Sequence, residues 1–190
     1  MTILPKYQTF VKRTIAGFID GLVFIPFDFL GDYFIDKFGH SFTIPWSFLD
    51  TIIWTLYFVI GHGKYGQTLG KKAMAIKVLD LDEKNLIGYK RAFIRESVWF
   101  FTSTIGLIYF LFTQRNNGLS DFPELQTNPV DDFISLTTGV WFILEIVTMI
   151  FNSKRRALHD FMAGSVVVDI DELKKEEYFA SLQNSFEPVQ

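Results

Sequence analysis

The sequence predicts an all-α membrane protein: a four-helix transmembrane bundle with a small cytoplasmic β-hairpin or strand element and an interfacial C-terminal helix. Three observations predict this fold class. The chain contains four long apolar stretches, and its basic residues are sorted between alternate connecting segments. Hydrophobic residues make up 49% of the 190 residues and include 22 Phe, a high content for a soluble protein of this size.

The four apolar stretches each approach the ~20 residues that a transmembrane helix needs. They cover residues 14–31, 44–62, 97–113 and 133–151. A soluble helical protein with buried helices is the alternative, and segment length alone does not decide between the two. The distribution of charge does.

Basic residues gather on one side of the predicted membrane when both termini share that side with segment 63–96. This side then carries sixteen of them: Lys6, Lys12, Arg13, Lys64, Lys71, Lys72, Lys77, Lys84, Lys90, Arg91, Arg95, Lys154, Arg155, Arg156, Lys174 and Lys175. The opposite side keeps two, Lys37 and Arg115. This imbalance follows the positive-inside rule. We therefore expect an integral protein of a bacterial inner membrane, in contact with the lipid bilayer, with both termini cytoplasmic.

The predicted cytoplasmic segments have structure of their own. Apolar and polar residues alternate over 75–81, a turn follows at 82–85, and the chain resumes at Leu86, which predicts a β-hairpin. After the fourth span, SKRRALHDFMAG predicts a short interfacial helix with basic residues on its polar face. SVVVDI is then a strand that could join the hairpin. Residues 8–170 form the predicted membrane domain and 171–190 a polar cytoplasmic tail.

Several classes of chemistry lack the residues they require. The chain has no Cys and three scattered His, so a metal site is not expected. The 18 basic and 21 acidic residues nearly cancel, which gives no basis for nucleic-acid binding. GHGKYGQTLGKK fails the spacing of a phosphate-binding loop because Tyr65 and Lys72 occupy the required Gly and Ser/Thr positions. We expect no cofactor and no enzymatic activity.

Asp20 is the most unusual residue of the first span, KRTIAGFIDGLVF. An ionised carboxylate at a helix centre costs about 2.5–3.5 kcal/mol on insertion, so it must be paired, solvated or protonated. Arg13 lies two helical turns earlier on the same face. Asp20 is therefore either a proton- or cation-exchanging site or a structural anchor between helices. Gly17 and Gly21 form a GxxxG pair that permits close helix packing.

Polar residues also form stripes on the second and fourth spans. Asp50 shares a helix face with Trp54 and Tyr57, and Glu145 shares one with Thr138 and Trp141. These stripes could line an ion or proton pathway containing Asp20, Asp50 and Glu145. They could equally be hydrogen-bonded seams between packed helices.

The cytoplasmic segments contain two further candidate groups. Gly66 and Gly70 would permit a tight turn at the membrane surface, where Lys71 and Lys72 would meet lipid phosphates or a carboxylate. Farther along, Arg155, Arg156 and Asp160 would form a clamp that ties the C-terminal segment to Arg13, to Asp20 or to the glycine-containing basic loop.

Three segments together resemble one family: RTIAGFID, GQTLGKKAMAIKVLD and RRALHDFMAGSVVV, with RAFIRES before the third span also fitting. The chain resembles the RDD family of small multi-pass membrane proteins, named for one arginine and two aspartates. The matching positions would be Arg13, Asp20 and Asp160. The resemblance implies the membrane topology. It also implies a role in transport of unknown ligands, since some members have been proposed as cation/proton antiporters.

Two functional hypotheses follow. The first is a non-enzymatic accessory or scaffold subunit of a membrane complex, with a membrane-protein partner or a second copy of the chain. The alternative is a secondary cation/proton exchanger that uses the intramembrane acidic residues.

Overall fold

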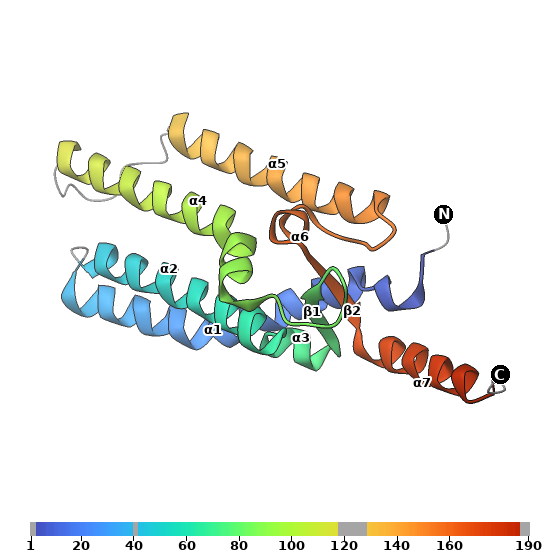
Figure 1. Ribbon diagram of the computed structural model, residues 1–190. Coiled ribbons are helices and arrows are strands. Elements are labelled where there is room, and N and C mark those ends of the chain that lie inside the picture. Colours follow the sequence, from blue (N-terminus) through green and yellow to red (C-terminus); the bar gives the residue numbers. More distant parts are fainter. Residues whose placement is uncertain (1–2, 40–41, 118–128, 187–190) are drawn as a thin grey trace.

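The computed structural model describes residues 3–39, 42–117 and 129–186 and is mostly helical (Figure 1). Four long helices lie alongside one another, and smaller elements gather at one end of them (Figure 1). The long helices are α1 (Phe10–Phe38), α2 (Thr43–Ile60), α4 (Gly88–Asn117) and α5 (Pro129–Phe151).

Within the described residues, three helical segments are long and apolar enough to cross a membrane. They are Pro5–Phe38, Thr43–Tyr65 and Asp132–Phe151. Each contains most or all of one predicted span. The remaining predicted span, 97–113, falls inside α4.

Aromatic side chains join α1 to α2. The ring of Phe24 stacks on Trp54 with centroids 3.9 Å apart, and Phe27 stacks on Trp46 at 4.6 Å. Trp46 also lies against Gly31, where an added Cβ would come within 2.1 Å of the indole nitrogen. The large rings thus fill the space between the two helices, and Gly31 is required because no side chain fits beneath the indole.

The second helix continues into short elements at the end of the molecule opposite the α1–α2 connection. A π-helical turn, η3 (Gly61–Tyr65), follows α2 directly, and the five-residue helix α3 (Leu69–Ala73) comes next. Between them Gly66 adopts a left-handed conformation with φ +69°, which reverses the chain. This position of Gly66 agrees with the predicted turn.

The predicted β-hairpin is wrong. Strand β1 (Ile76–Asp80) pairs antiparallel with the distant strand β2 (Ser165–Asp169), so that Ile76 lies opposite Asp169. The segment after the turn forms no second strand, and α4 begins at Gly88. The Asp80 carboxylate accepts hydrogen bonds from the backbone N–H groups of Lys84 and Asn85, which closes the loop on itself.

Burial on both faces of the sheet explains why SVVVDI is the partner of β1. Val167 packs in a core cluster that includes Ala16 of α1, while Val166 and Val168 pack on the other face with Tyr7. A strand covered on both faces is apolar throughout, which suits three consecutive valines. Tyr7 belongs to the short N-terminal turn η1 (Pro5–Tyr7).

Two helices flank β2 in the sequence. The short helix α6 (Leu158–Ala163) precedes it, and α7 (Ile170–Phe186) follows it and covers most of the predicted polar tail. The basic residues Arg155 and Arg156 precede α6, so they do not lie on a polar face of the helix as predicted. The N-terminal segment, the sheet, α3, α6 and α7 all lie at the same end of the long helices (Figure 1).

Candidate functional site

Asp20 lies fully buried at this end of the molecule, held by three hydrogen bonds. Tyr57 Oη of α2 donates to Oδ1 at 2.6 Å, and Thr68 Oγ1 donates to Oδ2, also at 2.6 Å. The backbone N–H of Gly70 donates to Oδ1 at 2.7 Å. Hydrogen bonds to an ionised acceptor are stronger than neutral ones. Asp20 therefore joins α1 to α2 and to the start of α3, and Arg13 is not its partner.

Gly70 allows this contact because α3 lies directly on α1. A Cβ at position 70 would be 2.0 Å from the carbonyl oxygen of Ala16 and 2.9 Å from the carboxyl carbon of Asp20. Gly70 thus lets the backbone of α3 come close to that of α1, whereas the sequence predicted that it forms a tight turn together with Gly66.

The two neighbouring lysines have different environments. Lys71 is buried, with its ammonium 6.0 Å from the centre of the Phe58 ring, whereas Lys72 is exposed. Burial, and then the positive charge of Arg95, lower the pKa of Lys71 to about 8, although Asp20 and Glu96 oppose the shift. Lys71 is therefore enclosed by protein and acted on by the charges of Glu96 and Asp20. The predicted contact of the two lysines with lipid phosphates or a carboxylate stays a prediction.

Asp160 lies fully buried between two arginines. Arg13 Nη1 of α1 donates to Oδ2 at 2.7 Å, and Arg95 Nη1 of α4 donates to Oδ1 at 2.5 Å. Burial raises the pKa of Asp160, but the charges of Arg95 and Arg13 more than offset burial and hold it well below its usual range. Asp160 also accepts from the Ala157 N–H at 3.0 Å, which fixes the start of α6.

The clamp predicted from Arg155, Arg156 and Asp160 thus has different members. Arg156 donates to the backbone oxygens of Ser165 and Asp160 and lies over the Phe161 ring at 4.1 Å. Arg155 donates to main-chain carbonyls at the end of α5. Neither pairs with the carboxylate of Asp160. The expected targets of the clamp were Arg13, Asp20 and the glycine-containing basic loop, and of these Asp160 contacts Arg13.

Arg95 was missed as a site residue, although RAFIRES was part of the resemblance. It also joins Asp160 to Glu145 through His159. Arg95 Nη2 lies 2.8 Å from His159 Nε2, and His159 Nδ1 lies 2.6 Å from Glu145 Oε2. A guanidinium only donates, so Nε2 accepts, and the ring donates its Nδ1 proton to Glu145. This chain of contacts anchors the end of α5 to α4 and α6.

His62 and Glu96 complete the buried group. His62 Nδ1 lies 3.1 Å from Glu96 Oε1, and Arg95 Nε lies 3.8 Å from the same oxygen. Among the described residues, nothing hydrogen-bonds to His62 Nε2 or to Arg13 Nη2, both of which are buried. We call the whole group the polar cluster: Arg13, Asp20, Tyr57, His62, Thr68, Lys71, Arg95, Glu96, Glu145, His159, Asp160 and Ser165.

Asp50, Gly17 and Gly21 lie outside the polar cluster. Asp50 is two helical turns from Tyr57 on α2, beyond the stacked rings of Phe24 and Trp54. Its Oδ1 is buried and has no hydrogen-bond partner among the described residues. A pathway joining Asp20, Asp50 and Glu145 stays a prediction.

At Gly17 and Gly21 an added Cβ would meet nothing within 4 Å. The close helix packing predicted there is therefore not made by another described part of this chain.

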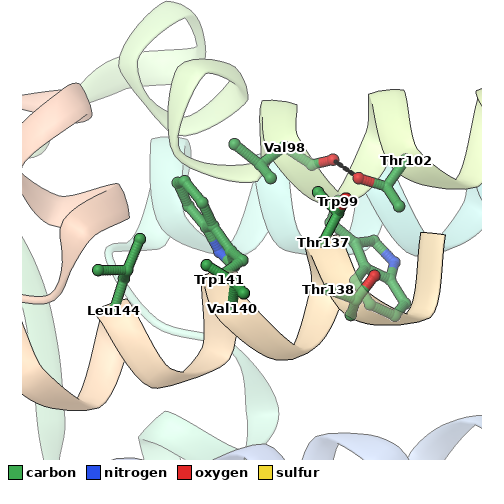
Figure 2. Close-up of a pocket in the computed structure, with 8 residues that line it drawn as sticks. All are labelled: Val98, Trp99, Thr102, Thr137, Thr138, Val140, Trp141 and Leu144. Atoms are coloured by element: carbon green, nitrogen blue, oxygen red, sulfur yellow. Dashed lines mark hydrogen bonds between the residues drawn. The ribbon is translucent and has the colours of Figure 1, made fainter. Parts of the chain in front are cut away.

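The stripe on α5 faces α4. Figure 2 shows Thr138 and Trp141 of α5 with Trp99 and Thr102 of α4 around a pocket of about 180 Å³. The Thr102 hydroxyl donates to the Val98 carbonyl of its own helix at 2.8 Å, so its hydrogen is not available to a ligand in the pocket. This region is an interhelical contact lined mainly by apolar side chains.

Comparison with known families decides the classification. The model of the RDD family matches residues 7–164, most of the chain. The chain belongs to the RDD family. No curated protein and no solved structure matches it. In this RDD protein the three residues expected from the family name, Arg13, Asp20 and Asp160, all lie in the polar cluster, where Arg13 pairs with Asp160 and Asp20 binds α2 and α3.

Proposed function

We propose that this RDD protein is a non-enzymatic accessory or scaffold subunit of a membrane complex. One observation carries the proposal: fixed protein groups already occupy both carboxylates expected from the family name. Asp20 accepts from Tyr57, Thr68 and Gly70, and Asp160 pairs with Arg13 and Arg95. A carboxylate that exchanges ions needs a place for the ion, whereas a structural anchor needs full hydrogen bonding.

The proposal includes a fourth span within α4 and a cytoplasmic location of both termini in a bacterial inner membrane. The charge imbalance of sixteen basic residues against two supports this orientation. The location of the N-terminal segment and α7 at the same end of the long helices also supports it (Figure 1). In this arrangement the polar cluster lies at the cytoplasmic ends of the spans.

The partner is a membrane protein or a second copy of the chain. The small size of the protein and the extent of its cytoplasmic end support an assembly role. At that end α7 extends away from the sheet (Figure 1), and most of its described residues are exposed. Purification of the full chain in a mild detergent should yield a defined complex with fixed stoichiometry.

A cation/proton exchanger is the second candidate, and Lys71 favours it. Burial, followed by the charge of Arg95, lowers the pKa of this lysine to about 8, and Asp20 is among the charges that act on it. An amine with such a pKa can take up and release a proton near neutral pH. In this mechanism Asp20, Asp50 and Glu145 would carry the cation or the proton.

Reconstitution into liposomes with an internal pH-sensitive dye separates the two candidates. The scaffold function predicts no proton movement on addition of Na⁺ or K⁺, for the unmodified chain and for Asp20→Asn alike. Asp20→Asn should instead weaken the complex seen in mild detergent, and the exposed Asp36→Asn on the same helix should not. Cation-driven proton movement that Asp20→Asn abolishes and Asp36→Asn leaves intact would establish the exchanger.

A further inference from the structure

A groove of about 560 Å³ lies where α2 ends and α3 begins, outside the polar cluster's buried interior. Ile60 and Tyr65 line it from the end of α2 and from η3, and Leu69 and Lys72 line it from α3. Its volume falls within the roughly 300–1,000 Å³ typical of ligand pockets. We call it the α2–α3 groove.

The walls of the α2–α3 groove are apolar and exposed. Ile60, Leu69 and Tyr65 are 42%, 55% and 56% exposed. The membrane-spanning candidate Thr43–Tyr65 ends at this point, which would place the groove at the boundary between hydrocarbon and headgroups. Tyr is enriched at that boundary, because its ring is apolar and its hydroxyl polar. An acyl chain is the apolar molecule available there.

The polar atoms at the back of the groove are already engaged. Tyr57 Oη donates to Asp20 and accepts from the Leu69 N–H at 3.0 Å. Gln67 Nε2 donates to the Ile76 carbonyl at 2.9 Å. A ligand that needs several hydrogen bonds from the groove, such as a sugar or a nucleotide, would find few there.

Lys72 supplies the charge at the groove. It is exposed, and no described residue pairs with it. None of the lining residues, all of them described, is acidic. Lys64, the residue before Tyr65, is exposed as well but does not line the groove. An apolar groove whose lining includes a lysine and no carboxylate is complementary to a molecule with an apolar chain and an anionic head.

We propose that the α2–α3 groove binds one anionic phospholipid, with an acyl chain along Ile60 and Leu69 and the phosphate at Lys72. Basic pockets at the cytoplasmic ends of membrane helices recognise anionic headgroups in this way. The lipid would cover the exposed side of α3, whose other side binds Asp20. The groove shares Tyr57 and Thr68 with the polar cluster, but the proposed contacts with the lipid come from Ile60, Leu69 and Lys72, none of which holds Asp20 or Asp160.

Native mass spectrometry of the full chain tests the proposal. The protein is released from micelles that contain equal amounts of phosphatidylglycerol and phosphatidylcholine with the same acyl chains. We expect one retained phosphatidylglycerol per chain in preference to phosphatidylcholine. Lys72→Gln should reduce that preference about fivefold, the effect of removing one lysine from an anionic surface. Leu69→Trp, which fills the groove, should reduce retention of both lipids.

Lys174→Gln is the matched control, because Lys174 is also exposed but lies on α7. It should leave the preference unchanged. The proposal is overturned if the unmodified chain retains both lipids equally, or if Lys72→Gln behaves like Lys174→Gln. It is also overturned if inorganic phosphate displaces phosphatidylglycerol fully, since the acyl chain would then contribute nothing.

Discussion

The two ends of the long helices are held together by different interactions. At the end that carries the sheet, charged and polar groups are buried and paired, and the valines of β2 are fully buried. From the middle of α1 towards the opposite end, α1 and α2 meet through aromatic rings. In the 18-residue apolar stretch of Asp132–Phe151, on α5, only 6% is buried inside the protein, against 22% in the corresponding stretch of Pro5–Phe38, which contains α1.

The solvent on each side explains this difference. Water at the end that carries the sheet drives apolar burial and makes a packed sheet favourable. Within the bilayer, lipid tails are as apolar as the side chains, so the helices gain little by burying them. Specific polar contacts at one end thus define the arrangement of helices that otherwise pack loosely.

Removal of Asp160 should be the most damaging change. Asp160→Ala leaves Arg13 and Arg95 buried without their partner, and loss of one member of a buried ion pair costs about 3–5 kcal/mol. The measurement is thermal unfolding in detergent, in which the fraction of protein that stays monodisperse is recorded as the temperature rises. Asp171→Ala on the exposed start of α7 is the control. Equal stability of the two variants would contradict the assigned role.

Two aspartates of the candidate membrane helices should respond differently to replacement by asparagine. Asp20→Asn weakens three hydrogen bonds to an ionised acceptor and should cost about 1.5–3 kcal/mol. Asp50→Asn should be neutral or stabilising, because Asp50 Oδ1 is buried without a partner among the described residues. Denaturant unfolding in the same detergent compares the two. Similar losses at both positions would show that Asp20 has no special role.

Two glycines, Gly70 of α3 and Gly17 of α1, should also respond differently to substitution by alanine. Gly70→Ala forces α3 away from the Ala16 carbonyl and should cost about 1–3 kcal/mol, whereas Gly17→Ala meets open space and should not destabilise. The chain has no Cys, so a disulfide between single cysteines introduced on α1 and α3 reports their distance directly. Undiminished cross-linking in Gly70→Ala would argue against close contact of the two helices.

The smallest effect should come from the titration of Lys71. Burial and then Arg95 lower its pKa from 10.5 to about 8, so below pH 8 the folded protein holds an unfavourable buried charge. Stability should rise as pH increases from about 8 towards 10.5, by about 1 kcal/mol between pH 7 and 9. Lys71→Met, which has no amine to titrate, should not show this rise in stability. The measurement is the free energy of unfolding of both proteins as a function of pH, and identical pH profiles would contradict the lowered pKa of Lys71.

Much of the architecture follows from local patterns. Hydropathy placed the long helices, and the apolar run SVVVDI indicated a strand. The partner of that strand could not be predicted from local patterns. An alternating segment followed by a turn is compatible with a hairpin and with a distant partner strand alike. Asp80 closed its own loop, and Ile87 was drawn into the core ahead of α4 instead of forming a strand.

The cluster shows the same limit. Arg13 and Asp20 stood out because one borders and the other interrupts an apolar stretch, and Asp160 stood out through the family resemblance. Arg95 did not, since it sits among other charges in a segment that looks like an ordinary helix start, although it contacts Asp160 and His159. Nothing in the spacing of basic residues distinguishes a buried arginine from those in contact with water.

The order of residues along the chain is enough to place the long apolar helices, to separate the basic residues between alternate connecting segments and to identify the RDD family. The partners of each aspartate depend on how the helices come together. Asp20 finds Tyr57 at a separation of 37 residues, and Asp160 finds Arg13 at 147. Helical periodicity relates residues within a few turns, whereas these partners are chosen by which helix ends come together. The aspartate in the first span is therefore held by hydrogen bonds from α2 and α3, and the arginine before it serves the other aspartate.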